Sequence, residues 1–170
     1  MNKFQNILKG GDLRSIGKAN EIVGMVNDQT AFDELFEGLT CSDRKVVMRT
    51  ADAIEKITFK KPDYLRKHKT ELLNLCQSVK DIELKWHLAL FVSRLTLTEK
   101  ETGEIWQLLT AWATDKKASR IVRVNSLQGL YDILQTNQKL EKDFNLTINV
   151  VSKEQIPSIN ARIRKFKNQP

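Results

Sequence analysis

The chain has 170 residues, of which 41% are hydrophobic and 29% are charged, and its net charge is +7. Its three prolines and seven glycines exclude long disordered linkers, and no apolar run reaches the about 18 residues that a membrane span needs. This composition is typical of one globular domain with a buried core. The first residues, MNKFQNILKGGD, lack the apolar core of a signal peptide, so we expect a cytoplasmic protein without a membrane partner.

The positive charge is concentrated in the later part of the chain. Residues 1–55 contain 7 Lys or Arg and 9 Asp or Glu, a net charge of −2, whereas residues 56–170 contain 21 and 12, a net charge of +9. A basic surface attracts acidic proteins, nucleic acids or anionic lipids, although a lysine-rich surface also serves solubility alone.

The first predicted elements are short helices. Residues 2–9 are compatible with one helix, and Asp12 is a suitable N-cap for a second helix over residues 13–26. Gly17 and Gly24 lie seven residues apart in that second helix and therefore share a face. Because glycine weakens a helix, we expect these positions to allow close packing against a neighbouring helix.

Later helices have clear start signals. A helix is predicted over residues 64–79, after the boundary at Pro62. Asp81 is an N-cap for the next helix, and Thr98 with Glu101 forms a capping box for the one that follows.

The end of the chain is also predicted to be helical. Residues 146–151, LTINVV, favour a strand by propensity, but the chain has no other strand signal to pair with them, so we predict a helix. Pro157 suits the first position of a final helix over residues 158–167, whose basic side chains are typical of a terminal capping element.

One segment recurs along the chain at a fixed interval. Residues 43–57, 81–95 and 119–133 are each offset by 38 residues, which is the signature of stacked-repeat architectures. In this register, apolar residues occupy equivalent positions that should point into the core: Ile54, Val92 and Leu130, and also Ile57, Leu95 and Ile133.

The first copy resembles the second helix of a HEAT repeat, because Asp43 is followed six residues later by Arg49. The second copy keeps Asp81 with His87 at the Arg position, and the third has Asn125 there. The resemblance to the HEAT and armadillo-like families implies an all-α fold, a right-handed α-α superhelix of stacked helical hairpins. It also implies a groove lined by the second helices and a protein-binding scaffold role. We expect a single α-solenoid domain over residues 1–170, built from a degenerate N-terminal cap (1–29), repeat hairpins (30–60, 61–97 and 98–135) and a C-terminal capping hairpin (136–170).

The register predicts which residues line the groove. Leu90 and Gln128 belong to an outward row, two residues before the core positions. We expect one continuous surface that contacts an acidic protein partner, formed by Arg94, Arg120, Arg123, Tyr131, Arg162 and Lys165. The alternative is that these residues are ordinary solvated faces of amphipathic helices.

The sequence contains no catalytic, cofactor or metal signature. Cys41, Cys76, His68 and His87 are not at metal-ligand spacing, and the cysteines are expected to be two buried or half-buried thiols. We therefore expect a protein that is not an enzyme and needs no cofactor. Nothing in the sequence indicates an oligomeric state.

Two other functions remain open. Basic clusters in the later half could follow a phosphate backbone, which would make the protein nucleic-acid binding. More remotely, a family of DNA glycosylases has similar helical repeats with a groove Asp and aromatic residues, and Asp132 beside Tyr131 is the comparable pair. Among the tryptophans, Trp112 lies on an apolar stripe and Trp106 lies off it, so Trp106 is either a core residue or an exposed interaction anchor.

Overall fold

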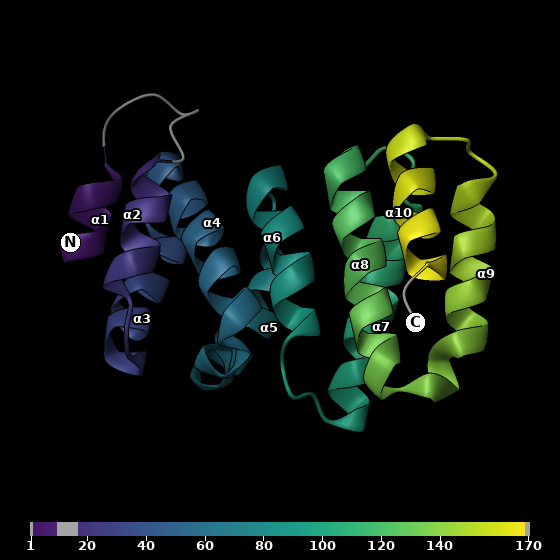
Figure 1. Cartoon of the computed structure of the whole chain (residues 1–170), viewed down its shortest axis with the longest axis horizontal. Helices are drawn as coiled ribbons and strands as arrows, with labels where there is room; N and C mark the ends of the chain where they lie inside the picture. Colours follow the sequence, from purple (N-terminus) through teal and green to yellow (C-terminus); the bar gives the residue numbers. More distant parts are fainter. Residues whose placement is uncertain (1, 10–16, 169–170) are drawn as a thin grey trace. The chain divides into compact units, whose positions relative to one another are not determined.

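A computed structural model describes residues 2–9 and 17–168, and across those ranges it is all-helical with no strand (Figure 1). The predicted all-α class is therefore confirmed. The chain divides into two compact units, Met1–His68 (unit 1) and Lys69–Pro170 (unit 2). This division falls inside the hairpin predicted for residues 61–97, and the single domain stays a prediction. Within the described ranges, every helix is too short or too polar to cross a membrane.

Unit 1 is built around its longest helix, α4. Its helices are α1 (Lys3–Leu8), α2 (Gly17–Met25), α3 (Gln29–Phe36) and α4 (Arg44–Lys60), with 3-10 helices at Glu37–Thr40 and Pro62–His68. Asp43 caps α4 by accepting from the Lys45 amide. α4 contacts α1, α2, α3 and both 3-10 helices, and its Ile54 is completely buried.

The expected close packing of α2 through its glycines is wrong for Gly24. A Cβ at Gly24 would meet no described atom within 4 Å, and the residue is exposed. The physical reason is that α2 turns other residues, Ala19 and Ile22, toward the core. The predicted cap at Asp12 lies outside the described residues.

Unit 2 consists of helical hairpins packed side by side. Its helices are α5 (Lys69–Ser78), α6 (Ile82–Ser93), α7 (Glu99–Thr114), α8 (Arg120–Thr136), α9 (Glu141–Ser152) and α10 (Pro157–Lys167), with a 3-10 helix at Gln138–Leu140. The first helices of the last two hairpins, α7 and α9, contact each other, and the second helices α6, α8 and α10 contact in sequence (Figure 1). Val92 and Leu130 are completely buried, as predicted from the register.

Most start signals in unit 2 act as predicted. Asp81 caps α6, Thr98 and Glu101 form the capping box of α7, and Pro157 opens α10. Residues 146–151 lie within α9, so the prediction of helix over strand is confirmed. The helix predicted over residues 64–79 begins later than expected, because a 3-10 helix precedes α5.

The tryptophans of unit 2 serve its core to different degrees. Trp112 is buried, as predicted. Trp106 is only 6% exposed and its ring centroid lies 6.5 Å from that of Phe144 on α9, so the anchor alternative for Trp106 is wrong. Trp106 is buried off the apolar stripe because α7 contacts both α8 and α9, which widens its buried arc. Trp86 is half-buried.

Candidate functional site

The second helices of unit 2 run parallel at a fixed register. The Asn125 side chain on α8 donates to the Trp86 carbonyl on α6 at 3.1 Å, and the Ser93 hydroxyl donates to the Asp132 carboxylate at 3.3 Å. Both bonds join residues that are 39 apart in sequence. α6 and α8 therefore lie in the same direction, with residues 39 apart at the same height.

A glycine allows these two helices to approach closely. A Cβ at Gly129 would lie 2.5 Å from the Ala89 carbonyl oxygen and 3.0 Å from Leu109 Cδ1. Any other residue at this position would push α8 away from α6 and α7. Gly129 thus keeps Ser93 and Asp132 within hydrogen-bond reach.

Asp132 is at the centre of a polar network on these helices. Its carboxylate accepts from Gln128 Nε2 at 2.7 Å and from Ser93 Oγ. Burial raises the pKa of Asp132, and this outweighs the lowering by the Gln128 and Ser93 hydrogen bonds and by the charges of Arg94 and Arg162. Asp132 is therefore a half-buried carboxylate that is influenced by the charges of two arginines.

Gln128 connects Asp132 to α10. Arg162 Nη1 donates to Gln128 Oε1, while the amide nitrogen of the same glutamine bonds Asp132. We call the surface formed by this network the second-helix face; it comprises Ser93, Arg94, Gln128, Asp132 and Arg162. The network spans α6, α8 and α10. The hydrogen bond to Gln128 orients the guanidinium of Arg162 and uses only one of the five N–H donors of that group.

Other residues of the predicted surface lie near this face. Tyr131 stacks on Phe166 with ring centroids 4.4 Å apart and planes 10° apart, so one side of its ring is covered. Lys165 is exposed on α10, three residues after Arg162, and Arg120 is exposed at the first position of α8. The structure therefore places Arg94 and Arg162 where their charges act on Asp132, with Tyr131 next to Asp132 on α8, Lys165 three residues after Arg162 and Arg120 at the other end of α8.

The prediction that Arg123 lies on the exposed surface is wrong. Arg123 is 1% exposed, and its Nε donates to the Ala113 carbonyl at 2.8 Å. Its two terminal nitrogens donate to the two carboxylate oxygens of Glu154 at 2.9 and 2.7 Å. A guanidinium can be buried in this way because its donors are matched by acceptors. The hydrogen bonds from Arg123 hold the pKa of Glu154 below its usual range, against a smaller opposing effect of burial.

The outward orientation predicted for Leu90 is also wrong. Leu90 is buried, as are Leu88, Ala89 and Phe91 next to it. The middle of α6 is buried on all sides, so register alone cannot assign an exposed row there. Gln128, which occupies the equivalent position on α8, is half-buried on the second-helix face.

Sequence reasoning missed an apolar part of the same surface. Ile82 is 55% exposed and Ile121 is 41% exposed, and each lies in the first turn of its helix. The sequence carried one signal for them, an isoleucine off the core stripe near a helix start. Ile82 directly follows the N-cap residue Asp81, and Ile121 lies two residues after the N-cap residue Ser119.

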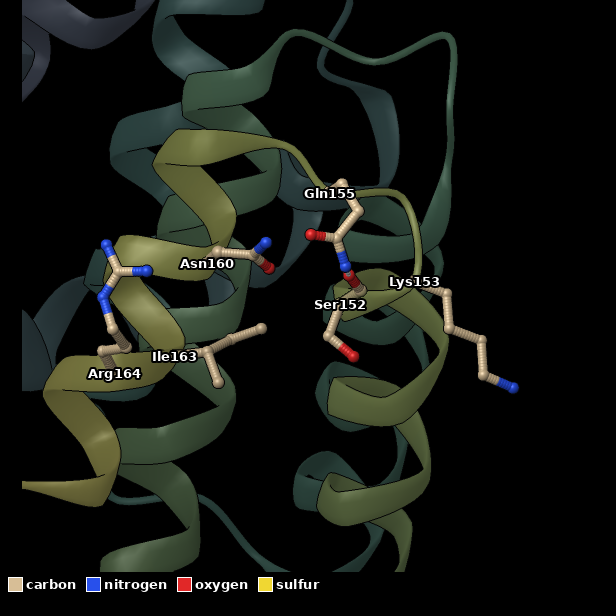
Figure 2. A pocket seen from close by; sticks show the side chains of 6 residues that line it. All are labelled: Ser152, Lys153, Gln155, Asn160, Ile163 and Arg164. Atoms are coloured by element: carbon tan, nitrogen blue, oxygen red, sulfur yellow. Dashed lines mark hydrogen bonds between the residues drawn. The ribbon is translucent and has the colours of Figure 1, made fainter.

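A shallow pocket lies between α9 and α10 in unit 2 (Figure 2). Its volume is about 300 Å³, and it is lined by Ser152, Lys153, Gln155, Asn160, Ile163 and Arg164. Figure 2 shows Asn160 and Ile163 pointing toward the gap, while the Lys153 side chain points away from it. The described residues also contain no group of three or more His, Cys, Asp or Glu side chains that could hold a metal ion.

Comparison of the chain with models of known protein families, with curated proteins and with solved structures gives no match.

Proposed function

We propose that this chain is a non-enzymatic, HEAT-like helical-repeat scaffold, stacked as a right-handed superhelix, that binds an acidic protein through its second-helix face. Its role would be to hold another protein rather than to transform a substrate. A cytoplasmic location stays part of this proposal.

The observation that supports the proposal most is the bond from Arg162 to Gln128, which also holds Asp132, so that Arg162 lies on the second-helix face in a fixed orientation. Guanidinium groups bind carboxylates in a bidentate geometry, and Arg162 is oriented by Gln128 before any partner arrives. A side chain that is already oriented loses less conformational entropy on binding. Lys165 adds an exposed positive charge within one turn of the half-buried Arg162.

A nucleic-acid partner fits the arrangement less well. Two clusters of exposed basic residues in unit 2 lie at opposite ends of helices α8 and α10: Lys116, Lys117 and Arg120 at the start of α8, and Arg164 and Lys167 at the end of α10. A phosphate backbone is followed by a continuous basic stripe, which these two clusters do not form. The exposed isoleucines Ile82 on α6 and Ile121 on α8 also suit a protein surface better than a phosphate backbone.

The test is fluorescence anisotropy with a labelled short peptide of Glu and Ser as the probe. The charge-reversal variant Arg162→Glu with Lys165→Glu should bind this peptide about tenfold more weakly than the unchanged protein. The matched control is Lys142→Glu with Lys153→Glu, which makes the same change of net charge at exposed positions on and just after α9. The control should bind as the unchanged protein does, and thermal unfolding should show that all three proteins are folded.

Equal losses in the two variants would contradict the proposal, because they would mean that only net charge matters. A labelled DNA duplex provides the second arm. The nucleic-acid function would be favoured instead if the protein bound the duplex more tightly than the peptide. That binding should then weaken steeply between about 50 and 200 mM salt.

A further inference from the structure

The second-helix face continues into an apolar area at the beginning of α6 and α8. Ile82 and Ile121 are 39 residues apart, which is the separation that the two interhelical hydrogen bonds set for residues at the same height. Parallel packed helices lie about 8–10 Å apart, so these two exposed side chains are neighbours. Trp86, half-buried, lies one turn further along α6 on the same side as Ile82. We call Ile82, Trp86 and Ile121 the isoleucine patch.

The isoleucine patch and the charged network are two ends of one surface. Ile121 and Asp132 are eleven residues apart on α8, which corresponds to about 16 Å along the helix axis. A segment in extended conformation covers that distance with about five residues. Resting on the function proposed above, we infer that the partner is a short acidic protein segment whose apolar side chains lie on the isoleucine patch and whose carboxylates reach Arg162 and Lys165.

Charge and size favour this occupant over a second copy of the chain. Two copies that met through this face would place two sets of the basic residues Arg94, Arg162 and Lys165 in one interface, and like charges in an interface are unfavourable. The isoleucine patch is also small, because it contains two exposed isoleucines and a half-buried tryptophan. Its surface area is much smaller than the about 1,000 Å² that a stable protein interface buries. An acidic segment with a few apolar residues complements both the charge and the extent of the surface.

The experiment compares two labelled peptides of equal net charge. The first carries a pair of leucines about five residues from a run of glutamates, and the second has serines in place of the leucines. The unchanged protein should bind the leucine peptide about tenfold more tightly, because burial of apolar surface adds to the charge contacts. In the variant Ile82→Ser with Ile121→Ser this advantage should disappear, while binding of the serine peptide stays the same.

The matched control is Leu146→Ser with Val150→Ser, which removes two similarly exposed apolar residues from α9. It should keep the tenfold advantage. If the double variant at the isoleucines is poorly folded, Ile121→Ser alone should show a partial loss of the advantage.

If the unchanged protein binds the two peptides with equal affinity, this inference is overturned. The proposed function still stands in that case if the charge reversal at Arg162 and Lys165 weakens binding of the serine peptide. Failure of both peptides to bind would overturn the proposed function as well. Sedimentation that shows a dimer of the unchanged protein and a monomer of the isoleucine variant would also overturn the inference, because the occupant would then be a second copy.

Discussion

At the scale of single residues, Arg123 connects α8 to two other parts of unit 2. Its guanidinium joins α8 to the Ala113 carbonyl at the end of α7 and to Glu154 in the turn after α9. Arg123→Ala should lower the free energy of unfolding by about 3 kcal/mol or more, because it leaves the carboxylate and the carbonyl without their donor. Urea unfolding measures this loss. Arg120→Ala, an exposed change on the same helix, should stay within about 0.5 kcal/mol of the unchanged protein.

The ion pair between Arg123 and Glu154 predicts a dependence of stability on pH. Because the folded-state pKa of Glu154 is lowered from its ordinary value of 4.5, the ion pair contributes its full stability above that value and loses it as the pH falls through the lower folded-state pKa. The difference in unfolding free energy between the unchanged protein and Glu154→Gln should therefore be constant near neutral pH and shrink in acid. A difference that grows on acidification would contradict the pairing.

The two cysteines should differ in reactivity. Burial raises the pKa of Cys76 to about 12, so its thiol stays protonated at mildly alkaline pH, whereas Cys41 is half-buried. The thiolate is the reactive species, so a thiol reagent should modify one cysteine per folded chain rapidly and the second only after unfolding. The variant Cys41→Ser should abolish the rapid reaction, and a rapid reaction that persists in it would contradict the burial of Cys76.

Sequence reasoning fails at Arg123, and it leaves Trp106 undecided between core and anchor, for a common reason. The charge of Arg123 suggests exposure, and only the approach of Glu154, 31 residues later, makes its burial tolerable. Trp106 lies off the apolar stripe, and only the contact of α7 with α9 covers it. Both outcomes depend on which elements pack together, which local spacing does not contain.

At the scale of elements, the contact between α6 and α8 is limited by one backbone position. Gly129→Ala should destabilise the protein by about 1–3 kcal/mol, because the added Cβ would meet the Ala89 carbonyl and the α6 backbone cannot easily move. Gly103→Ala on α7 is the matched control, since its Cβ would meet no described atom within 4 Å. The control should be stabilised by up to about 1 kcal/mol through helix propensity. Thermal or urea unfolding compares the two, and an unchanged stability of Gly129→Ala would contradict the close approach.

Helix starts were predictable because their causes are local. Asp81 and the pair Thr98 and Glu101 satisfy amide groups within three residues of themselves. The candidate site was predictable only in part. The repeat register included Arg94, and the predicted final helix included Arg162. The exposure of Ile82 and Ile121 depends on how the helix ends are left uncovered, which neither pattern specifies.

At the scale of the whole molecule, the charge is shared unequally between the units. Unit 1 has 12 Lys or Arg and 10 Asp or Glu, a net charge of +2, and unit 2 has 16 and 11, a net charge of +5. The proposed binding face therefore belongs to the more basic unit, and long-range attraction should speed the encounter with an acidic partner.

The tryptophans allow the unfolding of unit 2 to be followed separately. Trp86, Trp106 and Trp112 are the only tryptophans of the chain, and all belong to unit 2. Tryptophan emission therefore reports on unit 2 alone, whereas far-ultraviolet circular dichroism follows the helices of both units. If the chain is one cooperative domain, the two signals should change together as urea is added. Separate transitions would mean that each unit unfolds independently. The transition seen by tryptophan emission would then belong to unit 2 and would show which unit is the more stable.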